Sequence, residues 1–383
     1  MSDEILLRNG KVVTPFDVVE ADIKLGRGKI QGIGRKLKGA NAIDCKDKFI
    51  IPGLIDIHTH GCGGFSVMDG KIYEMSLFLA VHGVTSFVPT TVTASQDKLK
   101  TVAKKVFQAM QDDNYISQIL GLNLEGPWIS REKPGAQSKQ HIRTFSMEEF
   151  DEINERNVVK IITLAPEENM DIIKQISKRT IVSIGHSNAD YDTAKRAVAM
   201  GAKLFTHTFN AMSGFHHREP GVAGAALESD ETYCEIIPDL IHVHSAAIKI
   251  LIKAKGVDKV ILVTDAIEAA GLGDGEYELN LGRASVRNGA CRLPNGNLAG
   301  STLTLDRGVR NIVNMGINLK DAIKMATVNP AVLLGIEDKK GSIAVGKDAD
   351  LVILNKDLEI EKVIVRGKMM SEGLRIDQVK FSG

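Results

Sequence analysis

Residues 51–61 read Ile-Pro-Gly-Leu-Ile-Asp-Ile-His-Thr-His-Gly, a short apolar strand that ends at two histidines. Alternate side chains of a strand point to the same face, so His58 and His60 lie together on one side. Two imidazoles on one face can hold a metal ion between them. Glycines at positions 61, 63 and 64 then allow the chain to turn sharply. We therefore expect this segment to be the first strand of a barrel that carries a metal site.

The overall composition limits the classes of partner. The 383 residues include 48 basic and 48 acidic side chains, which gives no support for a nucleic-acid or anionic-membrane partner held by bulk charge. No uncharged apolar run is long enough to span a bilayer, and the acidic start at residues 1–4 predicts no secretory leader. The four cysteines are scattered and form no Cys-x-x-Cys pair, so we expect a protein of the reducing cytoplasm.

Both ends of the chain are rich in short β-type runs. Residues 4–50 contain several partly alternating runs separated by glycine and proline, and residues 349–354 and 361–367 have the same character. Lone hairpins are marginally stable in water, so we expect the two ends to combine. The sequence predicts a small β-sandwich domain made of residues 1–50 and 336–383.

Between these ends, apolar strand-like runs alternate with amphipathic helical runs. After the His58 strand, we expect seven more strands, at residues 83–90, 119–125, 158–165, 180–186, 202–207, 233–237 and 259–265. Apolar residues with helical spacing lie at residues 96–110, 147–155, 190–200 and 245–255. Eight strands alternating with helices predict an α/β fold, a (β/α)8 TIM barrel, over residues 51–335.

The residues at the strand ends carry the chemistry in such a barrel. The last residues of the predicted strands include four histidines and two carboxylates: His58, His60, Glu125, His186, His207 and Asp265. Each alone could have an ordinary packing or capping role, but six together at one end of a barrel favour a metal centre. Nitrogen and oxygen ligands without thiolate suit zinc, iron, manganese, cobalt or nickel, and the sequence does not choose among them.

Further polar residues follow the later strands. Three groups lie after the sixth, seventh and eighth strands, respectively: Asn210 with Ala211, His242 with His244, and the turn Leu298-Ala299-Gly300. We expect one of the two histidines to face the pocket and the other to be structural. Arg218 lies in the loop after the sixth strand, where a guanidinium could bind a carboxylate or phosphate through two hydrogen bonds.

These motifs resemble those of the amidohydrolase superfamily. The widespread features are the segment around His58 and His60 and residues 341–352, Gly-Ser-Ile-Ala-Val-Gly-Lys-Asp-Ala-Asp-Leu-Val. The narrower motifs are similar to one branch, the N-acetylglucosamine-6-phosphate deacetylases. They are Leu-Glu-Gly-Pro-Trp (124–128), Gly-His-Ser (185–187), Thr-His-Thr-Phe-Asn-Ala-Met (206–212), Arg-Glu-Pro-Gly (218–221), Val-Thr-Asp-Ala (263–266) and Leu-Ala-Gly-Ser (298–301). The resemblance covers nearly the whole chain.

The resemblance implies a role for each of these residues. The implied metal ligands are Glu125, His186 and His207, with His58 and His60 as a second metal site. Asp265 is the implied catalytic acid/base. The implied substrate contacts are Ala136, Gln137, Asn210, Ala211, Arg218, His242, Leu298, Ala299 and Gly300. One or two divalent transition metals per subunit are implied, and so is a homodimer in which a phosphate contact can come from the neighbouring subunit.

The implied reaction is hydrolysis of N-acetylglucosamine 6-phosphate to glucosamine 6-phosphate and acetate, in amino-sugar catabolism and cell-wall sugar recycling. A metal-activated hydroxide would attack the amide, and Asp265 would transfer the proton. Some members of the branch have histidine where Gln137 aligns, and glutamine can donate a hydrogen bond but cannot take up a proton. The segment before His242 also lacks the glycine expected there.

Two other classes of function stay open. One is a different metal-dependent amidohydrolase, such as a nucleobase deaminase or a cyclic amidase, against which Arg218 and residues 206–212 argue. The other is a non-catalytic barrel that serves as an interaction scaffold. Because such relatives usually lose ligands or the acid/base, the six filled positions argue against it.

Overall fold

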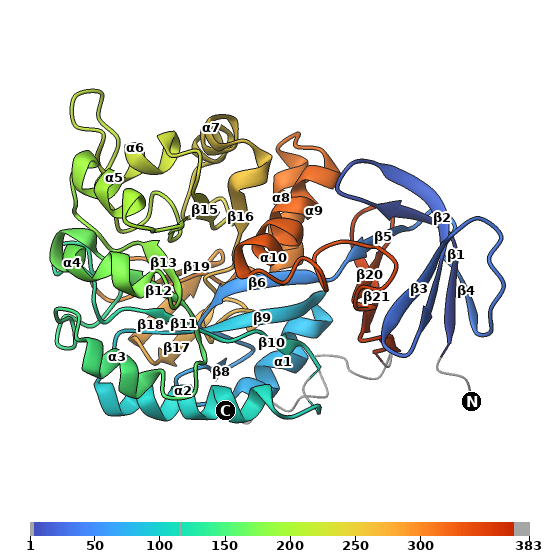
Figure 1. Ribbon diagram of the computed structural model, residues 1–383, viewed down its shortest axis with the longest axis horizontal. Coiled ribbons are helices and arrows are strands. Elements are labelled where there is room, and N and C mark those ends of the chain that lie inside the picture. The colour runs from blue at the N-terminus through green and yellow to red at the C-terminus, as the bar shows by residue number, and fades with distance from the viewer. Residues whose placement is uncertain (1–3, 115, 371–383) are drawn as a thin grey trace.

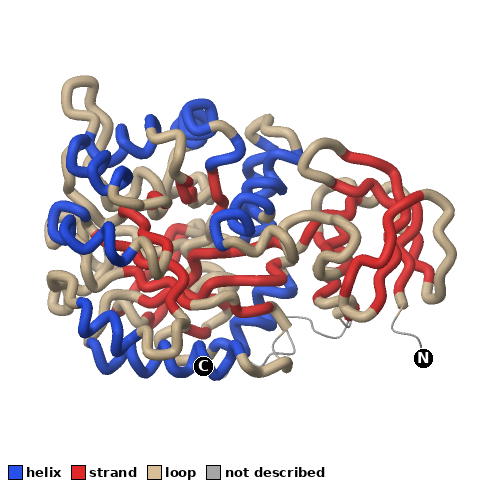
Figure 2. Tube along the Cα trace, viewed as in Figure 1, coloured by secondary structure: helices blue, strands red, loops and turns tan. Residues whose placement is uncertain are grey.

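The two ends of the chain come together beside a barrel built from the middle. The computed structural model describes residues 4–114 and 116–370. Figure 1 shows the first strands and the last strands packed side by side in one small β domain, and Figure 2 shows the strands of the larger domain surrounded by helices. Among these described residues, no helix is both long enough and apolar enough to cross a bilayer.

The small domain is one hydrogen-bonded sheet that draws on both ends of the chain. Its strands follow the order β22-β21-β20-β5-β1-β2-β3, with β4 beside β1. Their bounds are β1 (Ile5–Val13), β2 (Val18–Gly26), β3 (Lys29–Gly34), β4 (Ala42–Asp44), β5 (Phe49–Pro52), β20 (Leu351–Leu354), β21 (Ile360–Val365) and β22 (Lys368–Met369). The two ends meet where β5 runs antiparallel to β20, with Ile51 opposite Val352. The prediction that strands from both ends of the chain combine is confirmed in the form of this sheet, and residues 371–383 of the predicted β-sandwich domain lie outside the described residues.

The larger domain is the predicted barrel. Its eight strands are β6 (Leu54–Thr59), β9 (Val84–Thr91), β11 (Leu122–Glu125), β12 (Val159–Leu164), β13 (Ile181–Ile184), β14 (Leu204–Phe205), β15 (Tyr233–Ile236) and β16 (Val260–Leu262). Successive strands pair in parallel in this order. The last strand returns to the first, because the backbone N–H of Asp265 donates to the carbonyl of His58 at 2.8 Å. The hydroxyl of Thr264 also donates to Asp56 at 2.6 Å.

One predicted strand is divided in two. The run at residues 119–125 forms β10 (Gln118–Ile119), which pairs only with β9, and then β11, which pairs with both β9 and β12. The break falls at Gly121, whose φ of 145° a residue with a side chain rarely adopts. A Cβ at this position would also lie 2.9 Å from the carbonyl oxygen of Val158. The division brings Glu125 to the carboxyl end of a short strand.

The helices lie around the barrel (Figure 2). They are α1 (Ile72–Val81), α2 (Gln96–Met110), α3 (Met147–Ile153), α4 (Pro166–Ile176), α5 (Tyr191–Ala199), α6 (Gly221–Glu228), α7 (Ser245–Lys255), α8 (Leu305–Asn314), α9 (Leu319–Ala326) and α10 (Val328–Leu334), with a short 3-10 turn η1 (Val257–Lys259). The helices predicted around residues 96–110 and 245–255 have those bounds, and α3 and α5 are slightly shorter than predicted. Asp190 caps α5, since its carboxylate accepts the N–H of Thr193 at 2.8 Å.

The segment after the eighth strand holds a small antiparallel sheet that the sequence analysis did not predict. Its strands are β17 (Gly275–Leu279), β18 (Gly282–Arg287) and β19 (Ala290–Arg292). The buried side chains of Ile267, Leu279, Val286 and Cys291 form its own small core. A two-stranded ribbon, β7 (Gly61–Cys62) with β8 (Phe65–Ser66), follows the first strand of the barrel. The ribbon follows the strand end that carries His58 and His60, and the small sheet follows the strand end that carries Asp265.

Substituting Gly53 with alanine should destabilise the junction of the two domains. Gly53 lies between β5 and β6, its N–H donates to Asp350 at 2.8 Å, and an added Cβ would lie 2.1 Å from the hydroxyl oxygen of Thr85. We expect Gly53→Ala to lower the free energy of unfolding by roughly 1–3 kcal/mol, measured by urea denaturation. Gly214→Ala is the control, because no heavy atom lies within 4 Å of its added Cβ. Equal stability of the two variants would contradict this packing argument.

Candidate metal centre and active site

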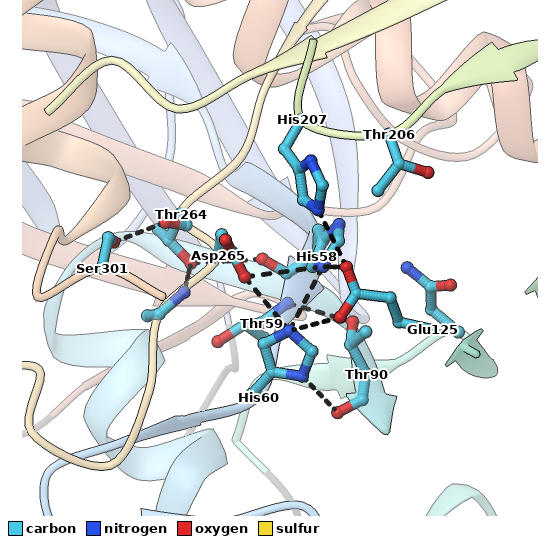
Figure 3. A network of polar contacts seen from close by, with 12 residues as sticks. His58, Thr59, His60, Thr90, Glu125, Thr206, His207, Thr264, Asp265 and Ser301 are labelled. Carbon is cyan, nitrogen blue, oxygen red and sulfur yellow. Dashed lines mark hydrogen bonds and ion pairs between the residues drawn. The ribbon is translucent and has the colours of Figure 1, made fainter. Parts of the chain in front are cut away.

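Six side chains from five strands of the barrel meet at the carboxyl ends of these strands. His58 lies on β6 and His60 just beyond it, Glu125 ends β11, and the others follow their strands within three residues. All six are buried: His58, His60, Glu125, His186, His207 and Asp265. Figure 3 shows five of them pointing toward a common centre. The convergence that the strand-end positions predicted is therefore present in the fold.

The ligand atoms form two overlapping groups that share Glu125. One group is His58, His60 and Glu125, the other is Glu125, His186 and His207, and within each the ligand atoms all lie within 4.8 Å of one another. Oε1 of Glu125 is 2.9 Å from Nε2 of His207 and 3.0 Å from Nε2 of His186. Its Oε2 is 3.3 Å from Nε2 of His60. A carboxylate placed between two pairs of imidazoles suits a pair of divalent metal ions.

The close approach of the imidazole nitrogens also fits metal binding. Nε2 of His58 lies 3.3 Å from Nε2 of His60, and Nε2 of His186 lies 3.1 Å from Nε2 of His207. Two buried nitrogens at this distance repel each other if both carry protons or if both present lone pairs. A cation between them removes this repulsion, because each lone pair can then coordinate it.

Second contacts hold three of the imidazoles in the orientation a ligand needs. Nδ1 of His58 lies 2.9 Å from Oε2 of Glu235, and Nδ1 of His60 lies 3.1 Å from the carbonyl of Thr90. Nδ1 of His186 lies 2.9 Å from the carbonyl of Lys133. Since each of these oxygens accepts a hydrogen bond, each Nδ1 carries the proton and each Nε2 keeps a free lone pair.

Asp265 is held beside the metal ligands as an ionised carboxylate. Its Oδ1 lies 3.1 Å from Nε2 of His60 and 3.6 Å from Nε2 of His58. Burial acts to raise the pKa of Asp265, but the polar contact with His60 and the influence of the surrounding histidines lower it to about 2. At neutral pH this carboxylate can accept a proton, as the implied acid/base role requires.

The backbone is strained at three of the six positions. The φ angles of His186, His207 and Asp265 are 47°, 27° and 48°, in the left-handed region that residues with side chains rarely occupy. Each follows the end of a short strand, where the turn aims the side chain inward. Such conformations cost of order 1–3 kcal/mol each and cluster at functional sites, so they independently support the assignment of this centre.

A cavity of about 430 Å³ opens above the centre. His60, Glu125, His186, His207 and Asp265 line its inner end. Seven of the predicted substrate contacts line it as well: Ala136, Gln137, Asn210, Ala211, His242, Leu298 and Gly300. The cavity and the candidate metal centre therefore form one site.

The two remaining predicted contacts lie elsewhere in this chain. Ala299 is fully buried in the core of the β17–β19 sheet, with its N–H donating to the carbonyl of Cys291 at 3.1 Å. Arg218 is exposed and lines a different cavity, of about 760 Å³, with Nη1 lying 2.8 Å from His217. Their roles as substrate contacts stay predictions.

The structure also shows different contacts for three polar residues of this region, His242, His244 and Gln137. His242 lines the cavity, and its Nδ1 lies 2.6 Å from Asp239. His244 instead caps α7 by accepting the N–H of Ala246 at 3.2 Å. Gln137 has both ends of its amide engaged, since it donates to Oε2 of Glu125 and accepts the N–H of Thr93 at 2.7 Å. It therefore orients the shared carboxylate.

Two residues of this region were missed by the sequence analysis. Glu235 is fully buried in β15, where its Oε2 contacts His58 and also accepts the backbone N–H of His207 at 3.1 Å. A charged residue inside the apolar run Tyr-Cys-Glu-Ile-Ile (233–237) was a signal that could have found it. Arg292 lines the cavity from β19, a strand that was not predicted.

Replacing both histidines of the first group should remove about one metal per subunit, because Glu125, His186 and His207 still form a complete group of three ligands. The measurement is elemental analysis of the purified His58→Ala/His60→Ala protein. His216→Ala, at an exposed histidine outside the 430 Å³ cavity, is the matched control and should keep the full metal content. Loss of all metal from the double variant would show that the groups do not bind independently.

Neutralising Glu235 should weaken metal binding at His58. The carboxylate holds the Nδ1 proton of His58, and removing such a partner commonly costs about 10- to 100-fold in metal affinity. We expect Glu235→Gln to release one metal to a chelator at a concentration that leaves the parent protein loaded, with unchanged circular dichroism. Glu276→Gln, in the exposed β17 strand, is the control. Identical chelator titrations for Glu235→Gln and the parent protein would contradict this role.

Comparison with known proteins places the chain in a family. The model of the amidohydrolase family matches residues 49–370. N-acetylglucosamine-6-phosphate deacetylase from Bacillus subtilis is 36% identical, over 99% of this chain and 100% of the relative. The crystal structure of N-acetylglucosamine-6-phosphate deacetylase from Pasteurella multocida superposes with a TM-score of 0.91 at 33% identity, covering 96% of this chain and 100% of that one.

A third comparison includes a ligand. A mutant N-acetyl-D-glucosamine-6-phosphate deacetylase from Mycobacterium smegmatis, in complex with N-acetyl-D-glucosamine-6-phosphate, gives a TM-score of 0.90 at 29% identity. It covers 96% of this chain and 99% of that one. The similarity thus extends through the barrel, the small β domain and the strand ends that carry the candidate ligands. On this evidence, the chain belongs to the amidohydrolase family.

Proposed function

We propose that the protein hydrolyses N-acetylglucosamine 6-phosphate to glucosamine 6-phosphate and acetate. The observation that carries the proposal is the shared Glu125 carboxylate between two pairs of histidines, with ionised Asp265 beside them at the inner end of a cavity. The relatives that match nearly the whole chain are deacetylases of this sugar phosphate. A cavity of about 430 Å³ has room for one such molecule.

Amide hydrolysis requires a more electrophilic carbonyl carbon and a way to protonate the amine, which is a poor leaving group. A divalent metal held by Glu125, His186 and His207, or a pair that includes His58 and His60, would polarise the amide carbonyl and lower the pKa of a water molecule. Zinc, iron, manganese, cobalt and nickel all suit this mixture of nitrogen and oxygen ligands, with one or two ions per subunit.

Asp265 performs the proton transfer in this proposal. Its carboxylate is ionised and lies on the cavity wall, so it can take the proton of the water as the water oxygen bonds to the carbonyl carbon. It then gives that proton to the amide nitrogen as the carbon–nitrogen bond breaks. The contact of 3.1 Å with His60 keeps the carboxylate oriented toward the centre.

The cavity wall supplies contacts to the sugar. Asn210, Ala211, Leu298 and Gly300 line the cavity and would contact the sugar, while His242, which also lines it, would contact the phosphate. Arg218 lines a second cavity of the same chain, so we assign its phosphate contact to the pocket of a neighbouring subunit, the arrangement that the family resemblance implies. A homodimer is therefore part of the proposal.

Two exposed apolar side chains support the homodimer, and the buried cysteines support a cytoplasmic location. Phe215, close to Arg218 in sequence, has 62% of its side chain exposed, and Leu240 on the loop that carries His242 has 44% exposed. Apolar side chains at these positions suit a contact between subunits. All four cysteines are free and buried, which supports a location in the reducing cytoplasm.

Asp265→Asn should lose at least about 100-fold in turnover while keeping its metal, because the amide cannot accept the proton. The assay is acetate release from N-acetylglucosamine 6-phosphate, run alongside metal analysis. Asp258→Asn, whose carboxylate is 73% exposed, is the matched control. Full turnover by a metal-loaded Asp265→Asn protein would remove Asp265 from its role.

Turnover of nucleobases or cyclic amides by the parent protein, without turnover of the sugar phosphate, would favour the other amidohydrolase class.

A further inference from the structure

The candidate active site carries a positive charge that neither the motifs nor the proposed function used. Within the described residues, the 430 Å³ cavity is lined by a single lysine or arginine, Arg292. Its inner end carries two carboxylates, Glu125 and Asp265. In the proposed function this end holds the metal and the reacting amide, so the 6-phosphate of the same molecule must lie away from it. The cavity therefore offers the phosphate one electrostatically favourable position, near the guanidinium of Arg292.

The local fold directs Arg292 toward the cavity. Successive side chains of a strand point to opposite faces, and the preceding residue in β19, Cys291, is buried in the core of the small sheet. Arg292 accordingly lies on the other face, where its side chain is exposed. Across an antiparallel bridge its partner is Leu298, which also lines the cavity.

The guanidinium is anchored but retains donors for a ligand. Nη1 donates to the carbonyl of Gly296 at 2.8 Å, and a guanidinium has five N–H donors in all. Among the ion pairs of the described residues, none joins a carboxylate to Arg292. By contrast, Arg287 on the adjacent strand β18 pairs with Glu276 at 2.9 Å. Arg292 is thus held in place without its charge being neutralised by a carboxylate.

Arg292 acts on the same region as His242. Burial lowers the pKa of His242, but the hydrogen bond and charge of Asp239 outweigh this effect, so the pKa is raised overall. The positive charge of Arg292 acts against this increase. Both side chains line the same cavity. Together they offer a planar guanidinium and an imidazole to a single anion.

We propose that Arg292 binds the 6-phosphate within its own subunit and sets the preference for phosphorylated over unphosphorylated sugar. A guanidinium can meet two phosphate oxygens at once. This inference rests on the proposed function for the identity of the substrate. It differs from the expected Arg218 contact, which comes from the neighbouring subunit, because Arg292 gives each subunit a cation of its own.

The test compares Arg292→Met with the parent enzyme on N-acetylglucosamine with and without the 6-phosphate. We expect KM for the phosphorylated sugar to rise roughly 10- to 100-fold with kcat nearly unchanged, because the lost contact stabilises the bound substrate and the transition state equally. We expect kcat/KM for the unphosphorylated sugar to stay within about 2-fold. Arg287→Met is the matched control, on the same small sheet but with its guanidinium paired to Glu276.

Binding of inorganic phosphate, measured by calorimetry on the metal-loaded protein, tests Arg292 without any turnover. Weaker binding by Arg292→Met than by Arg287→Met supports the proposal. Unchanged binding and unchanged KM would overturn it. Equal losses of kcat/KM on both sugars would also overturn it, because the arginine would then act through the fold of the small sheet. If the parent protein hydrolyses neither sugar, the proposed function fails, while the phosphate titration still decides the role of Arg292.

Discussion

The site depends on one buried carboxylate, Glu125, held among four imidazoles that come from the ends of three different strands. Its Oε1 contacts His186 and His207, and its Oε2 contacts His60. A carboxylate buried without compensation is very costly, so its neighbours must offer protons or a shared cation. Because these neighbours follow the first, fifth and sixth strands of the barrel, the arrangement exists only when the barrel is closed.

Several contacts outside the centre keep the barrel closed at this point. The bond from the N–H of Asp265 to His58 joins the eighth strand to the first and holds Asp265 against the metal ligands. Glu235 joins the first and sixth strands, because one of its oxygens contacts both the ring of His58 and the backbone of His207. The small β domain adds to this support, since its strand β5 continues through Gly53 directly into β6. The same residues therefore keep the barrel closed and hold the side chains of the candidate active site in position.

The walls of the cavity are built from less regular parts of the chain. Gln137 and Ala136 lie on the loop between β11 and α3, and Arg292, Leu298 and Gly300 belong to the small sheet and the turn after it. In barrel enzymes such connections vary independently of the strands, so they can change the substrate while the metal centre is retained. In the proposed function, the candidate metal ligands therefore account for amide hydrolysis, and these connections account for the choice of substrate.

The sequence by itself determined the barrel strands and the candidate ligands, because parallel strands buried on both faces are continuous apolar runs. Where such a run ends in a polar residue, as at Glu125, His186 and Asp265, the polar residue marks the carboxyl end of the strand. Six helices were not predicted: α1, α4, α6, α8, α9 and α10. For α6 the reason is related. The sequence of α6, Gly-Val-Ala-Gly-Ala-Ala-Leu-Glu (221–228), is apolar nearly all round, so it has no helical period to detect.

Only the tertiary structure decided how residues distant in sequence meet. It showed that His242 faces the cavity while His244 caps a helix, a choice that the local spacing of these two residues could not make. It also placed Arg218 on another cavity and brought Glu235 and Arg292 to the site. Burial and direction depend on what packs against a residue from other strands. The periodicity of one segment therefore gives the type of element, whereas the shape and charge of the pocket follow from the packing of many.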